Sequence, residues 1–227
     1  MSNLKKVYYV VLTYLYSFCG WIGADQIATN SSWTNNHILQ LWMRPKCTKI
    51  VYPPVDTDDL IAKTGDLSKI RDNLMISFAQ FRPEKDHALQ LRVWASVLPT
   101  LPADAKFYLI GSVRDEDDKR IVEALKDLAK KLGIDQSVEF KINLPRSELH
   151  DIFARAKVAV HTMRNEHFGI AVVELMASGI LTIAHNSAGP KEDIIGGTEL
   201  PVGYLAETEE EYARFVKEAM LRFEQKV

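Results

Sequence analysis

Two acidic residues, Glu166 and Glu174, stand eight positions apart in the segment EHFGIAVVE. If this segment is helical, eight residues rise roughly 12 Å, so the two carboxylates can bind the two hydroxyl-bearing ends of one elongated ligand. The backbone N–H groups of Phe168, Gly169 and Ile170 are then expected at the start of the helix, where such groups and the helix dipole favour a diphosphate. Gly169 has no Cβ, so a ligand can approach the backbone closely. Residue types and spacing therefore predict a nucleotide-sugar site.

Two cations, Arg82 and Lys85, follow an apolar run at 74–79 that reads as a strand. Ligands bind at the carboxyl ends of strands in doubly wound sheets, so both side chains are candidates for contact with a diphosphate. An arginine can bind two phosphate oxygens at once, whereas a lysine acts as a point charge. Spacing alone leaves open that both are ordinary surface cations in a solvated loop.

The residues around the two acids predict one strand–helix–strand unit. The β-rich run 157–162 precedes a polar loop, a helix over 169–177 follows, and a second apolar run covers 180–185. Gly179 lies where a helix is followed by a residue with positive φ. Such a unit brings the polar loop to the carboxyl end of its first strand.

The rest of the chain repeats this alternation and predicts an α/β fold. Further strands are expected over 74–79, 106–110, 137–141 and 202–205. Further helices are expected: one with Leu89, Leu91, Trp94 and Val97 on its apolar side, then 115–132, 147–155, a short 191–195 and a final helix that begins with a capping box, Thr208 with Glu211. The predicted architecture is a Rossmann-like parallel sheet with helices on both faces. Gly111, at the end of the second strand, is expected to let a nucleotide approach the backbone. The loop 143–145 could face its base.

Two patterns raise metal binding as an alternative. The acids at 115–118 contain a D-x-D pattern that suits a divalent cation, but they also lead a long amphipathic helix, whose dipole favours acids in its first turn. His161, His167 and His185 match no ligand spacing. We therefore expect helix capping for the acids, hydrogen-bonding roles for the histidines and no metal site.

The first 72 residues are expected to differ from the rest. Lys5 and Lys6 precede a largely apolar run at 7–24, which we interpret as an internal or membrane-surface helix; an anchor or signal segment stays open. A strand is expected over 25–29, then a helix capped by Ser32 or Thr34, a strand over 49–52 and a polar loop over 55–71. Pro53 and Pro54 mark the end of this part.

Composition excludes several classes of protein. The net charge of −2 and the absence of a basic stripe argue against a nucleic-acid partner. Two cysteines without paired spacing argue against a zinc ribbon or a disulfide scaffold and favour a reducing compartment. Apolar residues make up 47% of the chain and charged residues 26%, which is ordinary for a globular protein.

The segment Glu166–Glu174 resembles the E-x7-E motif of retaining, family-4 type GT-B glycosyltransferases. From about Tyr8 to the C-terminus the chain is similar to one family within them, the GDP-mannose-dependent α-1,2-mannosyltransferases that extend the dolichol-linked oligosaccharide on the cytosolic face of the endoplasmic reticulum membrane. The segments that carry this resemblance are 31–34 (SSWT), 51–54 (VYPP), 80–85 (QFRPEK), 140–143 (FKIN), 161–163 (HTM) and 184–187 (AHNS).

The resemblance implies a division of the chain and roles for its residues. Residues 1–54 would be a remnant of the acceptor-side domain, 55–72 a linker and 73–227 the donor-binding domain. Arg82 and Lys85 would neutralise the leaving diphosphate, and Glu166 would bind donor-sugar hydroxyls, so these three are the expected catalytic residues. Glu174 would bind the ribose and His161 would lie near the sugar. No metal or other cofactor is implied.

The implied partners are GDP-mannose, a lipid-linked oligosaccharide and a membrane surface touched by residues 7–24. Because most of the acceptor domain has no counterpart in this sequence, we expect the chain to bind GDP but to transfer no mannose by itself. Two alternatives remain at this point: a non-catalytic nucleotide-sugar-binding module that needs a partner subunit, and a UDP-sugar-dependent enzyme of the same fold, such as an epimerase.

Overall fold

The computed structural model describes residues 2–64, 71–198 and 202–222. The chain divides into two compact units, Met1–Pro54 and Val55–Val227. Residues 65–70, part of the expected linker, lie outside the described residues.

The described part of the second unit contains a six-stranded sheet in which every neighbouring pair is parallel. The strands are β3 (Leu74–Phe78), β4 (Lys106–Gly111), β5 (Val138–Ile142), β6 (Val158–His161), β7 (Leu181–His185) and β8 (Tyr204–Ala206). Their spatial order is β5-β4-β3-β6-β7-β8, so the chain starts at β3, moves outward to β5 and returns to the other side at β6. In this order the loops after β3 and β6 diverge, which opens a crevice at the carboxyl ends of these two strands.

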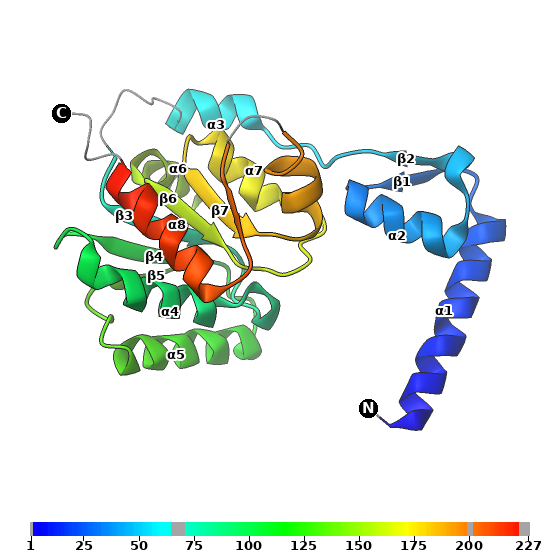
Figure 1. Cartoon of the computed structure of the whole chain (residues 1–227), viewed down its shortest axis with the longest axis horizontal. Coiled ribbons are helices and arrows are strands. Elements are labelled where there is room, and N and C mark those ends of the chain that lie inside the picture. The colour runs from blue at the N-terminus through cyan, green and yellow to red at the C-terminus, as the bar shows by residue number, and fades with distance from the viewer. Residues whose placement is uncertain (1, 65–70, 199–201, 223–227) are drawn as a thin grey trace. The chain divides into compact units, whose positions relative to one another are not determined.

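Helices cover both faces of this sheet, which confirms the predicted Rossmann-like class (Figure 1). The helices of the second unit are α3 (Thr57–Thr64), α4 (His87–Val97), α5 (Glu116–Lys131), α6 (Arg146–Arg155), α7 (Ile170–Ala177) and α8 (Glu209–Arg222). The group α4, α5 and α8 lies on one face, and the group α3, α6 and α7 lies on the other. Side chains alternate along a strand, so Met75 packs toward the first group while Leu74 and Ile76 pack toward the second.

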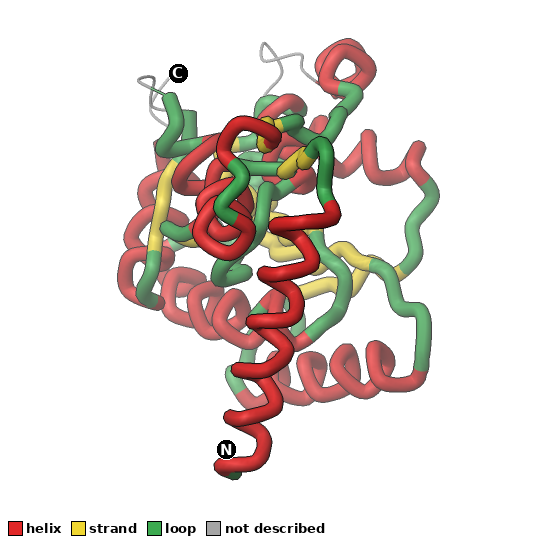
Figure 2. The backbone as a smooth tube through the Cα atoms, turned by 90° about the vertical axis from the view of Figure 1, so that its right-hand side faces the viewer, coloured by secondary structure: helices red, strands yellow, loops and turns green. Residues whose placement is uncertain are grey.

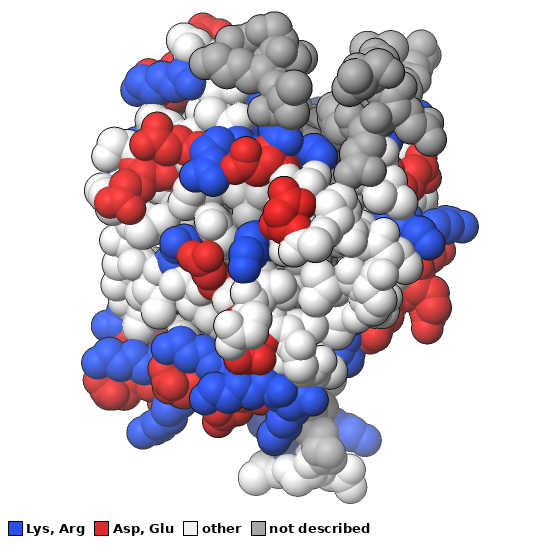
Figure 3. Space-filling view, turned by 90° about the vertical axis from the view of Figure 1, so that its left-hand side faces the viewer, with Lys and Arg blue, Asp and Glu red and all other residues white. Residues whose placement is uncertain are grey.

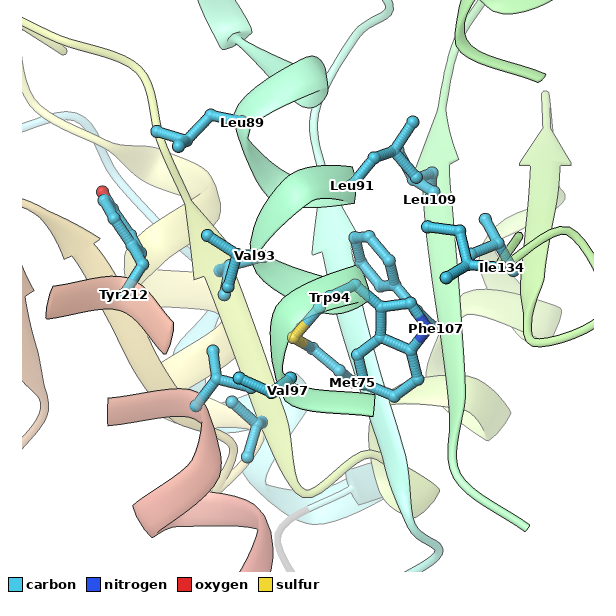
Figure 4. Packing of buried hydrophobic residues seen from close by; sticks show 14 of the residues in the cluster. Met75, Leu89, Leu91, Val93, Trp94, Val97, Phe107, Leu109, Ile134 and Tyr212 are labelled. Atoms are coloured by element: carbon cyan, nitrogen blue, oxygen red, sulfur yellow. The ribbon is translucent and has the colours of Figure 1, made fainter. Parts of the chain in front are cut away.

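The larger core cluster centres on Trp94 of α4, which is fully buried (Figure 4). Its ring lies 5.7 Å from that of Phe107 on β4, measured between centroids. Its indole N–H donates to the hydroxyl of Ser137 at 2.9 Å, so the buried polar atom is satisfied. Trp94 therefore ties α4 to the sheet at two points.

Part of the segment 55–71, expected to be a polar loop, forms the helix α3. Near the start of this helix, the backbone N–H of Asp59 donates to the side-chain carboxylate of Asp56 at 3.1 Å. The large apolar side chain that the helix buries is that of Leu60, which is 2% exposed and packs against α6 and α7. A single buried leucine gives too weak a periodic signal to be read from sequence. Arg71 is also buried, and donates to the carbonyl oxygens of Ala156 and Ser178 at 2.8 and 2.7 Å.

Several local predictions for the second unit are confirmed. Gly179 adopts φ 72° after α7. Thr208 and Glu211 form the reciprocal capping box of α8: the N–H of Glu211 donates to the Thr208 hydroxyl at 3.2 Å, and the N–H of Thr208 donates to the Glu211 carboxylate at 3.3 Å. The short helix expected over 191–195 is a single turn of π-helix, Pro190–Ile194.

The first unit is a small βαβ arrangement that follows a long helix. It contains α1 (Asn3–Gly23), β1 (Ile27–Thr29), α2 (Ser32–Trp42) and β2 (Thr48–Ile50), with β1 and β2 parallel. The residue that caps α2 is Ser31, whose hydroxyl accepts from the N–H of Thr34 at 3.1 Å, so the prediction of Ser32 or Thr34 was wrong by one position or more.

The helix α1 runs without a break (Figure 2), and Gly20 is its one buried residue among those described. A Cβ at Gly20 would collide with the indole of Trp42, so the glycine allows α1 and α2 to pack closely. The large apolar side chains of α1 are exposed, including Leu4, Tyr14 and Ile22. Within the described ranges, no helix has the length and apolarity needed to cross a membrane.

On the face drawn in Figure 3, Lys and Arg side chains lie interspersed with Asp and Glu. Along α5 the charges form pairs three residues apart, such as Lys126 with Glu123 at 2.8 Å. Such exposed pairs contribute little to stability individually.

Candidate functional site

Three of the candidate residues meet in one hydrogen-bonded cluster at the crevice between β3 and β6. Lys85 lies in a short 3-10 helix after β3, His161 ends β6 and Glu166 lies in the loop that follows β6. One carboxylate oxygen of Glu166 lies 2.7 Å from the Lys85 ammonium and 3.2 Å from Nε2 of His161. The sheet order makes β3 and β6 neighbours, and this brings together residues that are 81 positions apart.

The pKa of Glu166 is held well below its ordinary value. Burial by itself raises that pKa, but the hydrogen bonds from His161 and Lys85 outweigh it and lower the pKa to about 2. Glu166 is therefore an anion at neutral pH, and it balances the charge of Lys85.

The cluster borders a cavity of about 410 Å³ at the carboxyl ends of the strands. The cavity is lined by the end of β3 and its loop, the end of β4, the loop after β5, α6, the end of β6 and the first turns of α7. Its lining includes five predicted site residues: Lys85, Gly111, His161, Ile170 and Glu174. Apolar side chains complete the wall, among them Phe78, Ile110, Leu144 and Leu149. A cleft that is mostly apolar with a few convergent polar groups is typical of a small-molecule site.

Glu174 reaches this cavity from the second turn of α7. Burial raises the pKa of its carboxyl, and the nearby charge of Arg146 acts in the opposite direction. The two acids of the motif thus differ in environment: Glu166 is paired with two donors, whereas Glu174 faces the cavity in a partly desolvated position. Such a carboxylate gains most from a ligand that donates hydrogen bonds to it.

The start of α7 lies one residue later than the sequence suggested. Gly169 is the N-cap with φ 112°, a conformation that L side chains rarely adopt, and the helix begins at Ile170. The first N–H groups of a helix have no intrahelical partner, and here Ile170 and Ala171 line the cavity. Phe168, expected among the donors, is 8% exposed and is not one of the lining residues.

Arg82 lies on the same loop as Lys85 but is not among the residues that line the cavity. Its guanidinium is 3.8 Å from the carboxylate of Glu84, and about a third of its side chain is exposed. The two cations of the loop therefore differ, because Lys85 pairs with Glu166 across the site whereas Arg82 lies near the carboxylate of Glu84 on its own loop.

Gly111 lines the cavity, but the packing of neighbouring segments at the end of the sheet already requires a glycine at this position. A Cβ there would collide with the carbonyl oxygen of Ala79, just beyond the end of β3. The close approach that glycine allows is therefore between two neighbouring segments of the protein itself, and this suffices to explain the residue without a ligand.

Two further residues shape the loops of the site: Asn143, which begins the loop expected to face the base, and Gly189, which the sequence did not single out. Asn143 adopts φ 53°, and its side-chain amide accepts from the N–H of Val113 at 3.0 Å and donates to the carbonyl of Val113 at 3.2 Å. Gly189 donates its N–H to the carbonyl of Glu166 at 2.9 Å, and a Cβ there would collide with the backbone of Phe168. The asparagine after a strand was a signal of left-handed backbone geometry, whereas Gly189 is needed for the close approach of the Phe168 backbone.

The acids at 115–118 are used by α5 and its preceding loop. Asp115 caps the helix by accepting from the N–H of Asp118 at 2.9 Å, and Asp118, which is buried, accepts from the N–H of Arg114 at 3.1 Å. His185 bonds the hydroxyl of Ser187 at 2.9 Å. Over the described ranges, no group of three or more His, Cys, Asp or Glu side chains is arranged to hold a metal ion.

Residues 62–225 match the family model described as glycosyl transferases group 1. The chain belongs to this family. Residues 1–42 match a second family model, described as the ALG11 mannosyltransferase N-terminus. The division of the matches agrees with the two units of the structure.

Two curated relatives of the chain are both named GDP-Man:Man(3)GlcNAc(2)-PP-Dol alpha-1,2-mannosyltransferase. The chain is 44% identical to the protein of Homo sapiens over 222 residues, which cover 95% of the chain and 45% of the relative. It is 42% identical to the protein of Dictyostelium discoideum, over 95% of the chain and 44% of the relative. The chain thus spans less than half the length of these curated relatives.

Several solved structures share this fold. The chain is similar to Anabaena Alr3699/HepE in complex with UDP and glucose, with a TM-score of 0.71 and 18% identity, covering 94% of this chain and 57% of that one. It is similar to the pneumococcal O-GlcNAc transferase GtfA in complex with UDP and GlcNAc, with a TM-score of 0.70, 18% identity and coverage of 94% and 41%. At this identity the likeness concerns the fold.

Proposed function

We propose that this chain is the donor-binding half of a retaining α-1,2-mannosyltransferase, which moves mannose from GDP-mannose onto a dolichol-diphosphate-linked oligosaccharide. The observation that carries the proposal is the cluster of Lys85, His161 and Glu166 beside a cavity where the strand order reverses. The identity of 44% to a relative named for this reaction supports the choice of donor and acceptor.

In this proposal GDP occupies the cavity, and its diphosphate lies near Lys85 and the start of α7. Lys85 exchanges part of its pairing with Glu166 for a phosphate oxygen, and Arg82 turns from Glu84 to the second phosphate. Their positive charge stabilises the negative charge that grows on the diphosphate as the sugar–phosphate bond breaks. No cofactor is needed for this role, because the two side chains supply the charge.

The two acids hold the donor by its hydroxyl groups. Glu166 accepts hydrogen bonds from the mannose next to His161, and Glu174 accepts them from the ribose deeper in the cavity. Each charge-assisted hydrogen bond contributes about 1.5–3 kcal/mol, so Glu174→Gln should weaken GDP binding about ten- to a hundred-fold. The N–H groups of Ile170 and Ala171 at the start of α7 face the diphosphate in this arrangement.

The acceptor side is proposed to lie in the part of the relatives that this chain does not span. The first unit would belong to that side, and the exposed apolar face of α1 would contact the cytosolic surface of the endoplasmic reticulum membrane, where a lipid-linked acceptor is found. The isolated chain is therefore expected to bind the donor without transferring mannose.

Calorimetry with GDP, GDP-mannose and UDP tests the proposal. We expect GDP and GDP-mannose to bind, UDP to bind at least tenfold more weakly, and Lys85→Ala to weaken GDP binding tenfold or more. Lys106→Ala is the matched control, because Lys106 starts β4 at the opposite end of the sheet and donates to the carbonyl of Gln136 at 2.7 Å. Absence of GDP binding, or mannose transfer by the purified chain alone, would contradict the proposal.

A UDP-sugar-dependent enzyme is the second candidate, because the similar structures of HepE and GtfA hold UDP. The same titration separates the two, since this candidate requires UDP to bind more tightly than GDP.

A further inference from the structure

The hydroxyl of Thr162 connects the end of β6 to the loop that carries Lys85. Thr162 directly follows His161 and is 3% exposed. Its hydroxyl lies 2.7 Å from the carbonyl oxygen of Lys85 and 3.2 Å from that of Asp86. It accepts in turn from the side-chain amide of Gln90 on α4 at 2.8 Å, and Gln90 is 1% exposed. Three segments of chain are therefore joined by one buried hydroxyl.

The backbone that this hydroxyl holds is a strained turn. Asp86 adopts the left-handed conformation with φ 46°, between the 3-10 helix Pro83–Lys85 and α4, and its carboxylate caps α4 by accepting from the N–H of Leu89 at 3.2 Å. A non-glycine residue in this region of φ and ψ needs support from its surroundings. The two carbonyl groups bonded by Thr162 belong to the peptide units on either side of the Asp86 Cα, so the hydroxyl supports this conformation directly.

The other side of the β6 end is anchored as well. Tyr212 of α8 is fully buried, and its hydroxyl donates to the carbonyl oxygen of His161 at 3.1 Å. Burial, with the nearby charges of Asp86 and Glu211, raises the pKa of Tyr212, so the hydroxyl stays protonated and remains a donor. The Tyr212 hydroxyl thus holds the backbone of His161 in place, and the next residue, Thr162, bonds the backbone of Lys85 from that position.

We propose that Thr162 is a positioning residue for the donor site: its hydroxyl sets where the Lys85 ammonium lies relative to Glu166 and to a bound diphosphate, and Gln90 keeps that hydroxyl turned toward the Lys85 carbonyl. Thr162 itself does not line the cavity. The part that concerns the diphosphate rests on the function proposed above, whereas the part that concerns Glu166 does not.

The test compares Thr162→Val, which keeps the shape and removes the hydroxyl, with Thr162→Ser, which keeps the hydroxyl. Thr182→Val is the matched control, because Thr182 is also fully buried and donates to a carbonyl, that of Ile180, but at the opposite end of the neighbouring strand. Calorimetry measures the affinity of each variant for GDP and for guanosine, and carbon-13 NMR follows the titration of the Glu166 carboxyl group.

For Thr162→Val we expect GDP to bind about tenfold more weakly and guanosine to bind within about twofold of the wild type, because guanosine has no phosphate for Lys85 to contact. The pKa of Glu166 should rise from about 2 toward its ordinary value as Lys85 moves away. Thr162→Ser and Thr182→Val should keep both the wild-type GDP affinity and the wild-type titration of Glu166.

Equal losses for GDP and guanosine would show a general structural effect and overturn the proposal, as would wild-type behaviour of Thr162→Val. If Thr162→Val does not fold, Gln90→Met replaces it, and about a threefold loss specific to GDP is expected; wild-type affinity of that variant overturns the proposal. Failure of the wild-type chain to bind GDP would contradict the proposed function. In that case the NMR titration decides alone, and an unchanged Glu166 pKa in the variant overturns the positioning role.

Discussion

The two units of the chain differ in how much of their own surface they bury. In the second unit, helices cover both faces of a parallel sheet, and large side chains such as Trp94 and Tyr212 are completely buried. In the first unit no residue of α2 is buried, and two parallel strands form the described sheet. Both units resemble the same relatives. The extent of sequence similarity therefore does not predict how much of a unit is buried. In β1 the buried residues are Ile27 and Thr29, and a two-stranded sheet of this size gains little stability from burial.

The largest test of this difference compares two tryptophans. Trp94→Ala in α4 should lower the free energy of unfolding by about 3–5 kcal/mol, because it removes a fully buried ring and a satisfied indole N–H. Trp42→Ala in α2, where the ring is partly exposed against Gly20 and Tyr16, should change the main unfolding transition by less than about 1 kcal/mol. Denaturant unfolding followed by circular dichroism measures both; equal losses would show that the units share one core.

A second test uses the pH dependence of the second unit. His87 is 3% exposed and stacks near Phe81, and burial, with the charges of His161 and Lys85 nearby, lowers its pKa to about 4. The unfolded state keeps the ordinary value of about 6.5 and binds the proton first. The free energy of unfolding therefore carries the full contribution of the neutral His87 ring above pH 6.5. As the pH falls from 6.5 toward 4, protonation of the unfolded state lowers the free energy of unfolding by on the order of 3 kcal/mol.

The variant His87→Leu should remove that part of the pH dependence. Thermal melts at intervals from pH 7.5 to 4 are expected to show a flatter profile for the variant than for the wild type. At pH 7 the variant should be no less stable, because neither ring nitrogen of His87 has a hydrogen-bond partner. If the variant shows the same pH dependence of melting as the wild type, groups other than His87 cause the loss of stability at acidic pH.

The smallest effect is expected at the helix caps. Thr208→Ala removes half of the capping box of α8 and should cost about 1 kcal/mol in the main transition. Ser31→Ala removes the cap of α2 and should leave that transition unchanged if the first unit does not stabilise the second. Chemical denaturation of the two variants in parallel checks this, and a loss for Ser31→Ala as large as that for Thr208→Ala would contradict it.

Local structure could be predicted from the sequence where it depends on residues that are close together in the chain. The positive φ of Gly179, the capping box of Thr208 and the strand–helix–strand unit around Glu166 all depend on neighbours within a few positions. The alternation of strands and helices then predicted the fold class, because parallel strands need helical crossovers.

What the sequence did not reveal depends on distant partners. The pairing of Glu166 with Lys85 and the bond from Thr162 to the Lys85 carbonyl join segments 81 and 77 positions apart, and no local pattern encodes them. Likewise, a glycine is required at position 111 because a Cβ there would collide with the carbonyl oxygen of Ala79 on a neighbouring segment. The helix α3 was not predicted because most of its residues are polar and Leu60 is the one apolar residue of this helix that is buried in the core.

The reversal of strand order between β3 and β6 has a consequence for how the protein folds. The contact between Lys85 and Glu166 closes a loop that contains α4, β4, α5, β5, α6 and β6, so this contact depends on bringing together the two ends of a long segment of chain. Contacts of such high sequence separation form slowly, because the entropy of closing the loop is lost before they are gained. During synthesis on the ribosome, the cluster of Lys85, His161 and Glu166 would therefore form in one late step, after β6 and its loop have left the exit tunnel.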